Sequence, residues 1–514
     1  MGRYLVGVDV GTTNIKASLL DAAHGTVVHT AHRSTPVHHP RPEWSEFDPD
    51  ELWDGVVACL RGCVDAIDAA GAIAAIGVAS MGEAGIPVDN HGRPLSRAIA
   101  WYDPRATAQC DAWLERVGPD VSFDISGQTV GPLYTVFKLQ WLRDHQPETF
   151  HAMRTWLCIQ DFIVCKLCGI RAMDHSIASR TMLFDQRTRG WSPQLLHEAG
   201  LSDALFSTVA QAGTRVGSTT WAAAEATGLF PGTPVVLGGH DHLCGAFAVG
   251  SVRPGALLDS AGTAEVITFA VPTYDPVPAL LQQGYAVYSH VVPDTYAVVG
   301  SLRSSGASVR WYLERHWYPE KTEGRSPLDY EIAFAEAARV APGSEGLFAL
   351  PYIRGSGVPH RDSTFRGAFV GMSDVHGRSE MLRAILEGLG YWLREALNAS
   401  NEFLTVPLEP TINVTGGATN SALWMQPKAD ISGRTVVVPD IGEAVDIGEA
   451  VAVGAALLAG VGVGVYLSYE AAASAPVVRS RHYLPDAQRH MFYADRFEHV
   501  WRHLFPVLTG LSRS

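Results

Sequence analysis

Short apolar runs that stop at glycine or at a polar residue recur along this chain, and they predict buried strands. The first run ends around Asp9, and a second begins just after Lys16. Between them stand Gly11, Thr12 and Thr13. Two apolar runs separated by a short glycine-containing segment are typical of a β-hairpin. We therefore expect the chain to open with two strands joined by a tight turn.

Strand-like and helix-like segments alternate over the rest of the chain. Asp48, Pro49 and Glu51 begin a helix, because aspartate caps, proline suits the first turn and glutamate completes a capping box. Apolar runs predict further strands over residues 73–80, 98–105, 235–240, 255–261, 296–300, 412–415 and 435–438. Helices are predicted over residues 49–70, 305–315, 379–404, 424–430, 450–459 and beyond about 484, with a mainly helical region over 107–230. This alternation is typical of an α/β protein.

The opening turn carries groups that suit phosphate. Glycine lets the backbone approach a ligand closely, since it has no Cβ. The amides and hydroxyls of Thr12 and Thr13 can donate to phosphate oxygens, and Lys16 adds a cation. Asp9 would repel a bare phosphate, so it fits only beside a metal ion or a transferring proton. An ordinary hairpin with a Gly-Thr turn explains the same residues, and this stretch alone leaves both interpretations open.

Two later segments repeat parts of this pattern. An apolar strand is followed by Gly262 and Thr263, about 250 residues after the first Gly-Thr pair. A later strand runs into Gly416 and Gly417. The two Gly-Thr turns suggest duplicated domains that face each other across a cleft. The length of 514 residues independently favours two large domains, since a single core rarely grows that far.

Carboxylates and aromatic residues mark other strand ends. Asp241 follows an apolar strand and a Gly-Gly pair, where it can act as a general base or simply cap the next helix. Glu83 lies between two glycines just after another apolar strand. The strand over residues 98–105 contains Trp101 and Asp103 near its end, which predicts a ligand-facing edge because strand ends host function. A packed tryptophan beside a surface ion pair is the alternative.

Composition narrows the functional class. The formal net charge of −14 argues against nucleic acid or an anionic membrane as the main partner, although a phosphate site needs only local donors. No apolar run reaches membrane-spanning length and the start lacks the regions of a signal peptide, so we expect a cytoplasmic protein. Seven cysteines, an odd number, argue against a disulfide framework. They fit buried helix positions, with a metal or redox site as the alternative.

The order of these motifs resembles the FGGY carbohydrate kinases, members of the actin-like, ribonuclease-H-like ATPase superfamily. Asp-x-Gly-Thr-Thr, Gly-Gly-x-Asp, a second Gly-Thr and a late strand-Gly-Gly-helix follow one another between about residue 4 and about residue 465. The resemblance implies an α/β fold of two actin-like (ribonuclease-H-like) domains, each a mixed sheet flanked by helices, around a central cleft. It implies a sugar-binding domain over residues 1–252 and a nucleotide-binding domain over residues 253–514.

The resemblance also assigns roles, position by position. It implies ATP as the phosphate donor with Mg²⁺, and Asp241 as the base that takes the proton of the attacking sugar hydroxyl. It implies nucleotide contacts at Asp9, Gly11, Thr12, Thr13, Lys16, Gly262, Thr263, Gly416, Gly417, Asn420 and Ser421, with Asp9 also near the metal. It implies sugar or polyol contacts at Glu83, Trp101, Asp103, Tyr134 and Asp241. Dimers are common in such families, so a homodimer is one expected state.

Departures from the family pattern bear on the substrate. Xylulose kinases of the family carry a Met-His-Gly type loop and glycerol kinases an Arg-Glu pair, whereas this chain has Met81-Gly82-Glu83. A carboxylate in the pocket should repel a sugar acid, so we expect a small neutral substrate, a ketose or a sugar alcohol. A sugar-acid kinase such as a gluconate kinase, and a catalytically silent nucleotide-binding homologue, are the alternatives.

Two local features lie outside the family pattern. Residues 440–451 read Asp-Ile-Gly-Glu-Ala-Val twice. We expect the second copy to start the last small-residue helix, with Glu449 in its first turn, and the first copy to form a surface bulge. The alternative is that both copies are structured. Pro427 falls inside a predicted helix and should end or kink it.

Overall fold

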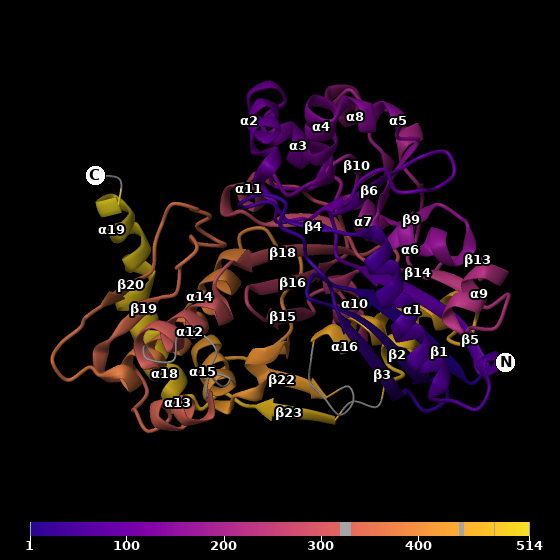
Figure 1. Cartoon of the computed structure of the whole chain (residues 1–514). Coiled ribbons are helices and arrows are strands. Elements are labelled where there is room, and N and C mark those ends of the chain that lie inside the picture. Colours follow the sequence, from indigo (N-terminus) through magenta and orange to yellow (C-terminus); the bar gives the residue numbers. More distant parts are fainter. Residues whose placement is uncertain (1, 319–329, 441–446, 477–478, 513–514) are drawn as a thin grey trace.

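The computed structural model describes residues 2–318, 330–440, 447–476 and 479–512, and these form two large mixed sheets with helices around them (Figure 1). The first sheet has the strand order β13-β14-β5-β1-β2-β3. Its strands are β1 (Tyr4–Val10), β2 (Asn14–Asp21), β3 (Thr26–Ser34), β5 (Ile73–Ser80), β13 (Arg215–Ser218) and β14 (Pro234–His240). β1 pairs antiparallel with β2 and parallel with β5, and β14 pairs parallel with β5. The predicted opening hairpin is confirmed.

The second sheet repeats this arrangement. Its strand order is β17-β18-β16-β15-β21-β22-β23. Its strands are β15 (Leu257–Ala261), β16 (Glu265–Val271), β17 (Ala286–Ser289), β18 (Tyr296–Leu302), β21 (Thr411–Thr415), β22 (Thr435–Asp440) and β23 (Arg479–Tyr483). The order β3-β2-β1-β5-β14 of the first sheet corresponds to β18-β16-β15-β21-β22 of the second, with the same parallel and antiparallel pairings. The expected α/β fold with two similar domains is confirmed.

Helices cover the faces of both sheets. The first sheet lies between α1 (Pro49–Asp65) with α6 (Ile159–Cys168) and, on the other face, α10 (Asp241–Ala248) with α16 (Ile447–Gly462). The second sheet packs against helices that include α12 (Ser305–Tyr312), α14 (Arg378–Ser400) and α15 (Ala422–Ser432). A strand that is buried on both faces has a nearly continuous apolar sequence, and β1 is such a strand.

Helix α16 lies between β22 and β23 of the second sheet in the chain but packs on the first sheet. A Cβ on Gly7 of β1 would lie 1.8 Å from the carbonyl oxygen of Ala452, and a Cβ on Gly454 would lie 2.0 Å from that of Cys244 in α10. Small residues therefore let the helix approach the sheet and α10 at backbone distance. The helix begins at Ile447 with Glu449 in its first turn, as expected for the second copy of the repeat. The first copy, expected as a surface bulge, starts at Asp440, which ends β22, and its residues 441–445 lie outside the described residues.

A smaller, mainly helical unit is inserted between β5 and β14 and lies at the top of Figure 1. Its core includes Trp113, Phe137 and Trp141. Its helices are α2 (Thr107–Arg116), α3 (Pro119–Ser126), α4 (Thr135–His145), α5 (Pro147–Ala152), α7 (His175–Ser179) and α8 (Pro193–Ala199). A small sheet of order β4-β7-β6-β8 joins it to the first domain through β4 (Glu46–Phe47), β6 (Gly85–Val88), β7 (Ala98–Ile99) and β8 (Thr155–Cys158).

Some predicted elements end elsewhere. The first helix stops at Asp65 rather than near residue 70. The strand expected over residues 98–105 stops at Ile99, because the chain turns there and Asp103 caps a short 3₁₀ turn. Helix α15 continues through Pro427 to Ser432, so of the two expected effects, an end or a kink of the helix, the end is wrong. Pro427 is buried, and the packing of α15 against α14 outweighs the loss of one backbone hydrogen bond.

Six of the seven cysteines lie on helices as expected, whereas Cys158 ends the strand β8, and five of the seven are buried. Cys59 and Cys63 are buried in α1, and their thiols donate to the carbonyl oxygens of Ile15 and Ala17. Burial raises the pKa of Cys59 to about 11 and that of Cys63 to about 12, so both thiols are protonated at neutral pH. Among the described residues, no helix combines the length and the apolar character needed to cross a membrane.

Candidate active site

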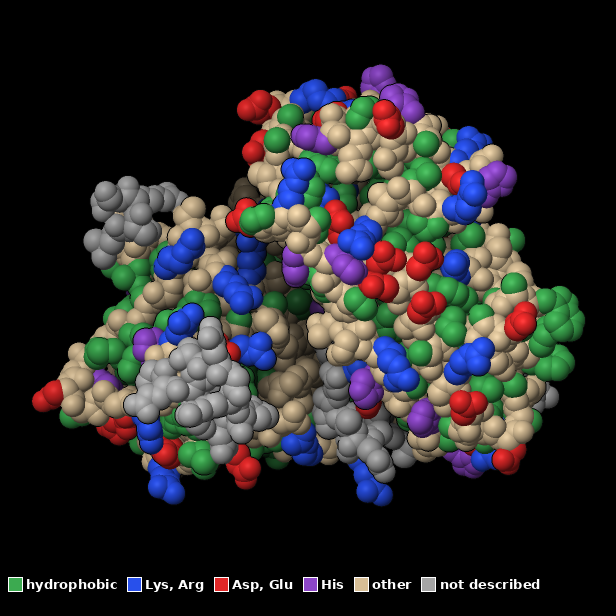
Figure 2. Space-filling view, viewed as in Figure 1, with side chains coloured by type: hydrophobic (Ala, Val, Ile, Leu, Met, Phe, Trp, Pro, Cys, Tyr) green, Lys and Arg blue, Asp and Glu red, His purple; other side chains and the backbone are tan. Residues whose placement is uncertain are grey.

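A cavity of about 1450 Å³ opens between the two sheets, and residues from both halves line it. The recess between the halves is visible in the space-filling view (Figure 2). The predicted residues on its wall are Asp9, Gly11, Thr12, Thr13, Lys16, Asp241, Gly262, Thr263, Gly416, Gly417, Asn420 and Ser421. The fold therefore brings four distant motifs to one place, as the family resemblance implied.

The first Gly-Thr turn joins β1 to β2. The backbone N–H of Gly11 donates to the carbonyl oxygen of Asn14 at 3.0 Å, which closes the turn. Asp9 and Lys16 stand opposite each other on the two strands, and both line the cavity. This hairpin thus brings one acidic and one basic residue to the cavity wall.

The second Gly-Thr turn joins β15 to β16 and rests on the start of α12. The N–H of Gly262 donates to the carbonyl of Ala264 at 2.9 Å. The N–H groups of Gly306 and Ala307 donate to the carbonyl oxygens of Gly262 and Thr263, both at 3.0 Å. The first turn of α12 therefore holds this loop in place against the cavity.

A buried group of three charges lies beneath the second turn. Lys428 of α15 donates to Asp259 Oδ2 and to Glu265 Oε1, each at 2.5 Å, and all three side chains are 0% exposed. Ser305, the first residue of α12, donates to the other oxygen of Glu265 at 2.5 Å. Burial and the neighbouring Glu265 raise the pKa of Asp259 to about 7. One lysine thus ties the phosphate hairpin to the helix that follows the Gly-Gly motif.

Asp241 is the first residue of α10, and its side chain is 26% exposed on the cavity wall. Burial opposes its ionisation, but His240, His242, the backbone N–H of His242 at 2.6 Å and Arg180 outweigh it, so its pKa lies below the ordinary value. Burial also lowers the pKa of His240 to about 3, which keeps that ring neutral near pH 7. Asp241 is therefore a carboxylate at neutral pH and can accept a proton.

Glu83 occupies a strained turn between β5 and β6. Its φ is +60°, and the N–H of Ala84 donates to the carbonyl of Gly82 at 2.6 Å, which is the rare form of γ-turn. A non-glycine residue in such a conformation costs on the order of 1–3 kcal/mol, and such strain clusters at functional sites. Thr135 Oγ1 holds the Glu83 carbonyl at 2.9 Å, and the carboxylate pairs with Arg180. The turn is thus fixed at both its backbone and its side chain.

Trp101 and Tyr134 lie on two sides of this region. Trp101 is 37% exposed, and its Nε1–H donates to Thr12 Oγ1 at 2.9 Å, so a residue predicted for the sugar contacts the first phosphate turn. Tyr134 is buried, its hydroxyl donates to Gln128 at 3.0 Å, and its ring faces the guanidinium of Arg180. Tyr134 therefore packs against Arg180, the partner of Glu83.

Asp103 takes a structural position instead. Its carboxylate is 0% exposed, accepts from the N–H of Ser45 at 2.6 Å and pairs with Arg105 at 2.7 Å. The Arg105 guanidinium in turn lies 3.9 Å from the ring centre of Trp44. We therefore leave Asp103 out of the substrate site, because its charge and its hydrogen-bonding capacity are satisfied inside the protein. The predicted ion pair is present, but it is buried rather than on the surface.

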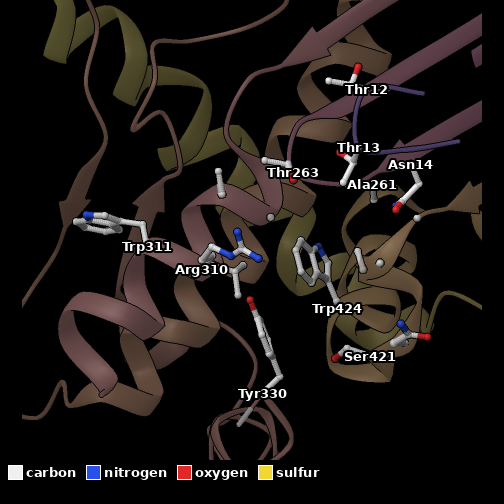
Figure 3. Close-up of a pocket in the computed structure, with 18 of the residues that line it drawn as sticks. Thr12, Thr13, Asn14, Ala261, Thr263, Arg310, Trp311, Tyr330, Ser421 and Trp424 are labelled. Carbon is white, nitrogen blue, oxygen red and sulfur yellow. The ribbon is translucent and has the colours of Figure 1, made fainter. Parts of the chain in front are cut away.

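The nucleotide end of the cavity contains residues that the motifs did not indicate (Figure 3). Arg310 and Trp311 come from α12, and Tyr330 begins α13 (Tyr330–Ala337). Figure 3 shows Arg310 and Tyr330 on one side of the space and Trp424 beside Ser421 on the other. Aromatic rings and a guanidinium suit a planar base. They could not be found in the sequence because no glycine-rich turn precedes them.

Family models match both halves of the chain. The N-terminal domain of the FGGY family of carbohydrate kinases matches residues 4–248, and its C-terminal domain matches residues 257–463. The chain belongs to the FGGY family of carbohydrate kinases. It is therefore a carbohydrate kinase by family, as the motif order indicated.

Named relatives extend over the full length of this kinase. A xylulose kinase of Escherichia coli (strain K12) is 30% identical over 512 residues, which cover 98% of this chain and 99% of the relative. An autoinducer-2 kinase of Escherichia coli (strain ATCC 8739) is 30% identical over 530 residues, which cover 99% of this chain and 95% of the relative. The crystal structure of a xylulose kinase from Rhodospirillum rubrum has a TM-score of 0.88 at 28% identity and covers 100% of both chains.

Proposed function

We propose that this kinase transfers a phosphoryl group from ATP to a hydroxyl of a small neutral sugar or polyol, with Asp241 as the general base. The observation that carries the proposal is the position of Asp241 on the wall of the cavity that both Gly-Thr turns line. Phosphoryl transfer needs positioning and charge neutralisation more than covalent chemistry. A carboxylate between two phosphate-binding turns adds the remaining requirement, a proton acceptor for the attacking hydroxyl.

We propose that the cavity holds ATP with Mg²⁺. The backbone and hydroxyl groups of Thr12, Thr13 and Thr263 would donate to phosphate oxygens, and Lys16 would add a cation. A Cβ on Gly417 would meet no atom within 4 Å, so the wall at the Gly-Gly motif is open toward a ligand. Asp9 and the phosphates are the oxygen donors that would hold Mg²⁺, which neutralises phosphate charge when it is bound.

The sugar would lie between Asp241 and Glu83. Glu83 Oε1 receives the bonds from Arg180, and within the described part of the chain no hydrogen bond to Oε2 is present. This second oxygen can accept a substrate hydroxyl, while Trp101 covers an apolar face of the ring or chain. We keep Glu83, Trp101, Tyr134 and Asp241 as the proposed substrate residues.

Two alternatives make different predictions for one experiment. We propose to measure ADP release in a coupled assay over tetroses, pentoses, hexoses, the corresponding polyols and their aldonic acids. Stimulation by neutral substrates supports the proposal. Stimulation by acids alone would assign a sugar-acid kinase, and a protein that binds ATP but responds to no sugar would be a silent homologue. Asp241→Asn, which should remove the stimulated rate, controls for a contaminating kinase.

A further inference from the structure

Arg180 follows α7 in the inserted unit and reaches into the substrate region from below Glu83. Its Nε–H donates to Glu83 Oε1 at 2.7 Å, its Nη2 group donates to the same oxygen, and its Nη1 group donates to Gln128 Oε1 at 2.9 Å. The arginine side chain is 14% exposed and that of Glu83 is 5% exposed. The two opposite charges thus form one enclosed pair, with the guanidinium fork on a single carboxylate oxygen.

The absence of a side chain at position 82 makes room for this pair. A Cβ on Gly82 would lie 3.0 Å from Arg180 Cγ and 3.0 Å from His240 Cδ2. Arg180 and His240 therefore stand side by side over the glycine, next to the proposed base Asp241. Position 82 carries no cation, because it is a glycine. The cation beside Glu83 comes instead from Arg180, which is 97 positions after Glu83 in the chain.

Two tyrosine rings, one from each half of the molecule, enclose the guanidinium. The Cζ atom of Arg180 lies 5.2 Å from the ring centre of Tyr134 and 5.1 Å from that of Tyr288, which belongs to β17 of the second sheet. Contacts at this distance attract a cation to the ring face. The position of Arg180 is therefore determined by four neighbours, and its freedom to follow a substrate is small.

We propose that Arg180 is a specificity-determining positioning residue, which fixes Glu83 for one substrate hydroxyl and keeps this end of the site electrically neutral. This inference rests on the proposed sugar kinase function. An isolated Glu83 would repel every anionic substrate, and an isolated Arg180 would attract a carboxylate. The Glu83–Arg180 pair has no net charge, so it neither repels an anionic substrate nor attracts a carboxylate. This end of the site therefore selects substrates by the position of their hydroxyl groups. Because Arg180 compensates Glu83, the repulsion of a sugar acid comes from the Asp241 carboxylate rather than from Glu83.

Removing one charge at a time should shift the preference between aldonate and polyol, and the two single variants should shift it in opposite directions. We expect Glu83→Gln, which leaves the Arg180 cation uncompensated, to raise the kcat/KM ratio of an aldonate over its polyol at least ten-fold. Arg180→Gln, which leaves the carboxylate uncompensated, should lower the same ratio at least ten-fold. The double variant should return the ratio to within about three-fold of wild type, because the net charge at positions 83 and 180 is zero again, even if its absolute rate is low.

The measurement uses substrate pairs of equal carbon number, which are erythritol with erythronate, arabitol with arabinonate, and sorbitol with gluconate. Arg187→Gln is the matched control. Arg187 also pairs with a carboxylate, Asp124, and also faces a tyrosine ring, that of Tyr274, but it is 48% exposed and lies outside the site. It should leave the ratio unchanged. Arg180→Lys keeps the charge without the fork, so the ratio should persist while KM for the polyol rises.

The outcomes separate this inference from the proposed function. An active wild-type enzyme whose ratio is unchanged in both single variants would overturn the role of Arg180, because loss of mere stability lowers all rates alike. Glu83→Gln preserves the shape of the side chain, and thermal unfolding of each variant identifies one that fails to fold. A wild-type protein with no sugar-stimulated ADP release would instead overturn the proposed function itself.

Discussion

The two Gly-Thr hairpins have the same topology but use their charges in opposite ways. In the first, Asp9 and Lys16 face each other across the strands and line the cavity. In the second, Asp259 and Glu265 point away from the cavity and share Lys428 inside the protein. The first hairpin therefore places its two charged residues on the cavity wall, and the second buries its two carboxylates against a lysine of α15.

The spacing from the glycine explains the difference. Asp9 stands two positions before Gly11, whereas Asp259 stands three positions before Gly262. Successive side chains on a strand point to opposite faces, so one position decides whether a carboxylate meets the cleft or the core. Two hairpins of the same topology can thus keep a similar Gly-Thr turn while the charges around them differ in position and partner.

The largest effect should come from changing Asp241, the proposed general base, which lines the same cavity as both hairpins. Asp241→Asn removes the proton acceptor between the two turns, and loss of a general base costs roughly 10²- to 10⁴-fold in rate. We expect turnover to fall by at least that much while ATP affinity, measured by calorimetry, stays close to wild type. A variant that keeps half its activity would mean that the turns do not converge on Asp241.

Lys428→Met tests the structural role of the second hairpin. It leaves two carboxylates buried without their cation, and breaking a buried pair in this way costs about 3–5 kcal/mol. We expect that loss in the free energy of unfolding, measured with urea. The triple variant Lys428→Met, Asp259→Asn, Glu265→Gln removes all three charges and should recover most of it. If Lys428→Met is as stable as wild type, the charged group does not hold the hairpin.

Lys16→Met is the corresponding change in the first hairpin. Because Lys16 lines the cavity, we expect kcat/KM for ATP to fall by roughly 10²- to 10³-fold, the usual cost of one donor to a transition-state charge. Stability should fall by less than in Lys428→Met. If Lys16→Met loses stability but phosphorylates normally when folded, Lys16 has the same structural role as Lys428. The two hairpins would then not differ in how they use their charged residues.

The smallest effect should appear as a pH dependence of the second hairpin. The pKa of Asp259 is about 7 in the folded protein, above the ordinary 3.8, so folding favours its protonated form. The stability that this group contributes is present at low pH and is lost as pH rises through 7. Relative to Asp259→Asn, the wild type should lose roughly 2 kcal/mol of unfolding free energy between pH 5 and pH 7. A pH-independent difference would contradict this assignment.

Sequence alone determined the features that a few neighbouring residues encode. Both hairpins, the Gly-Gly turn and the strand that precedes Asp241 follow from apolar runs and from glycines at fixed offsets, which act within one or two elements. The order of these motifs was sufficient to predict the fold, the family and the cavity wall, since motif order follows the chain and needs no tertiary contact.

The tertiary structure determined which partner each charged side chain contacts. The sequence pattern predicted Asp103 as a ligand residue, but in the folded protein its carboxylate contacts Arg105 and Ser45. No sequence motif marks Arg180, and only the fold places it beside Glu83. The cost or benefit of a charge depends on the partners and the solvent around it, and these partners come from positions far apart in the chain. The pattern of the sequence marks the turns and strands, but only the folded protein determines which of their side chains remain available to a substrate.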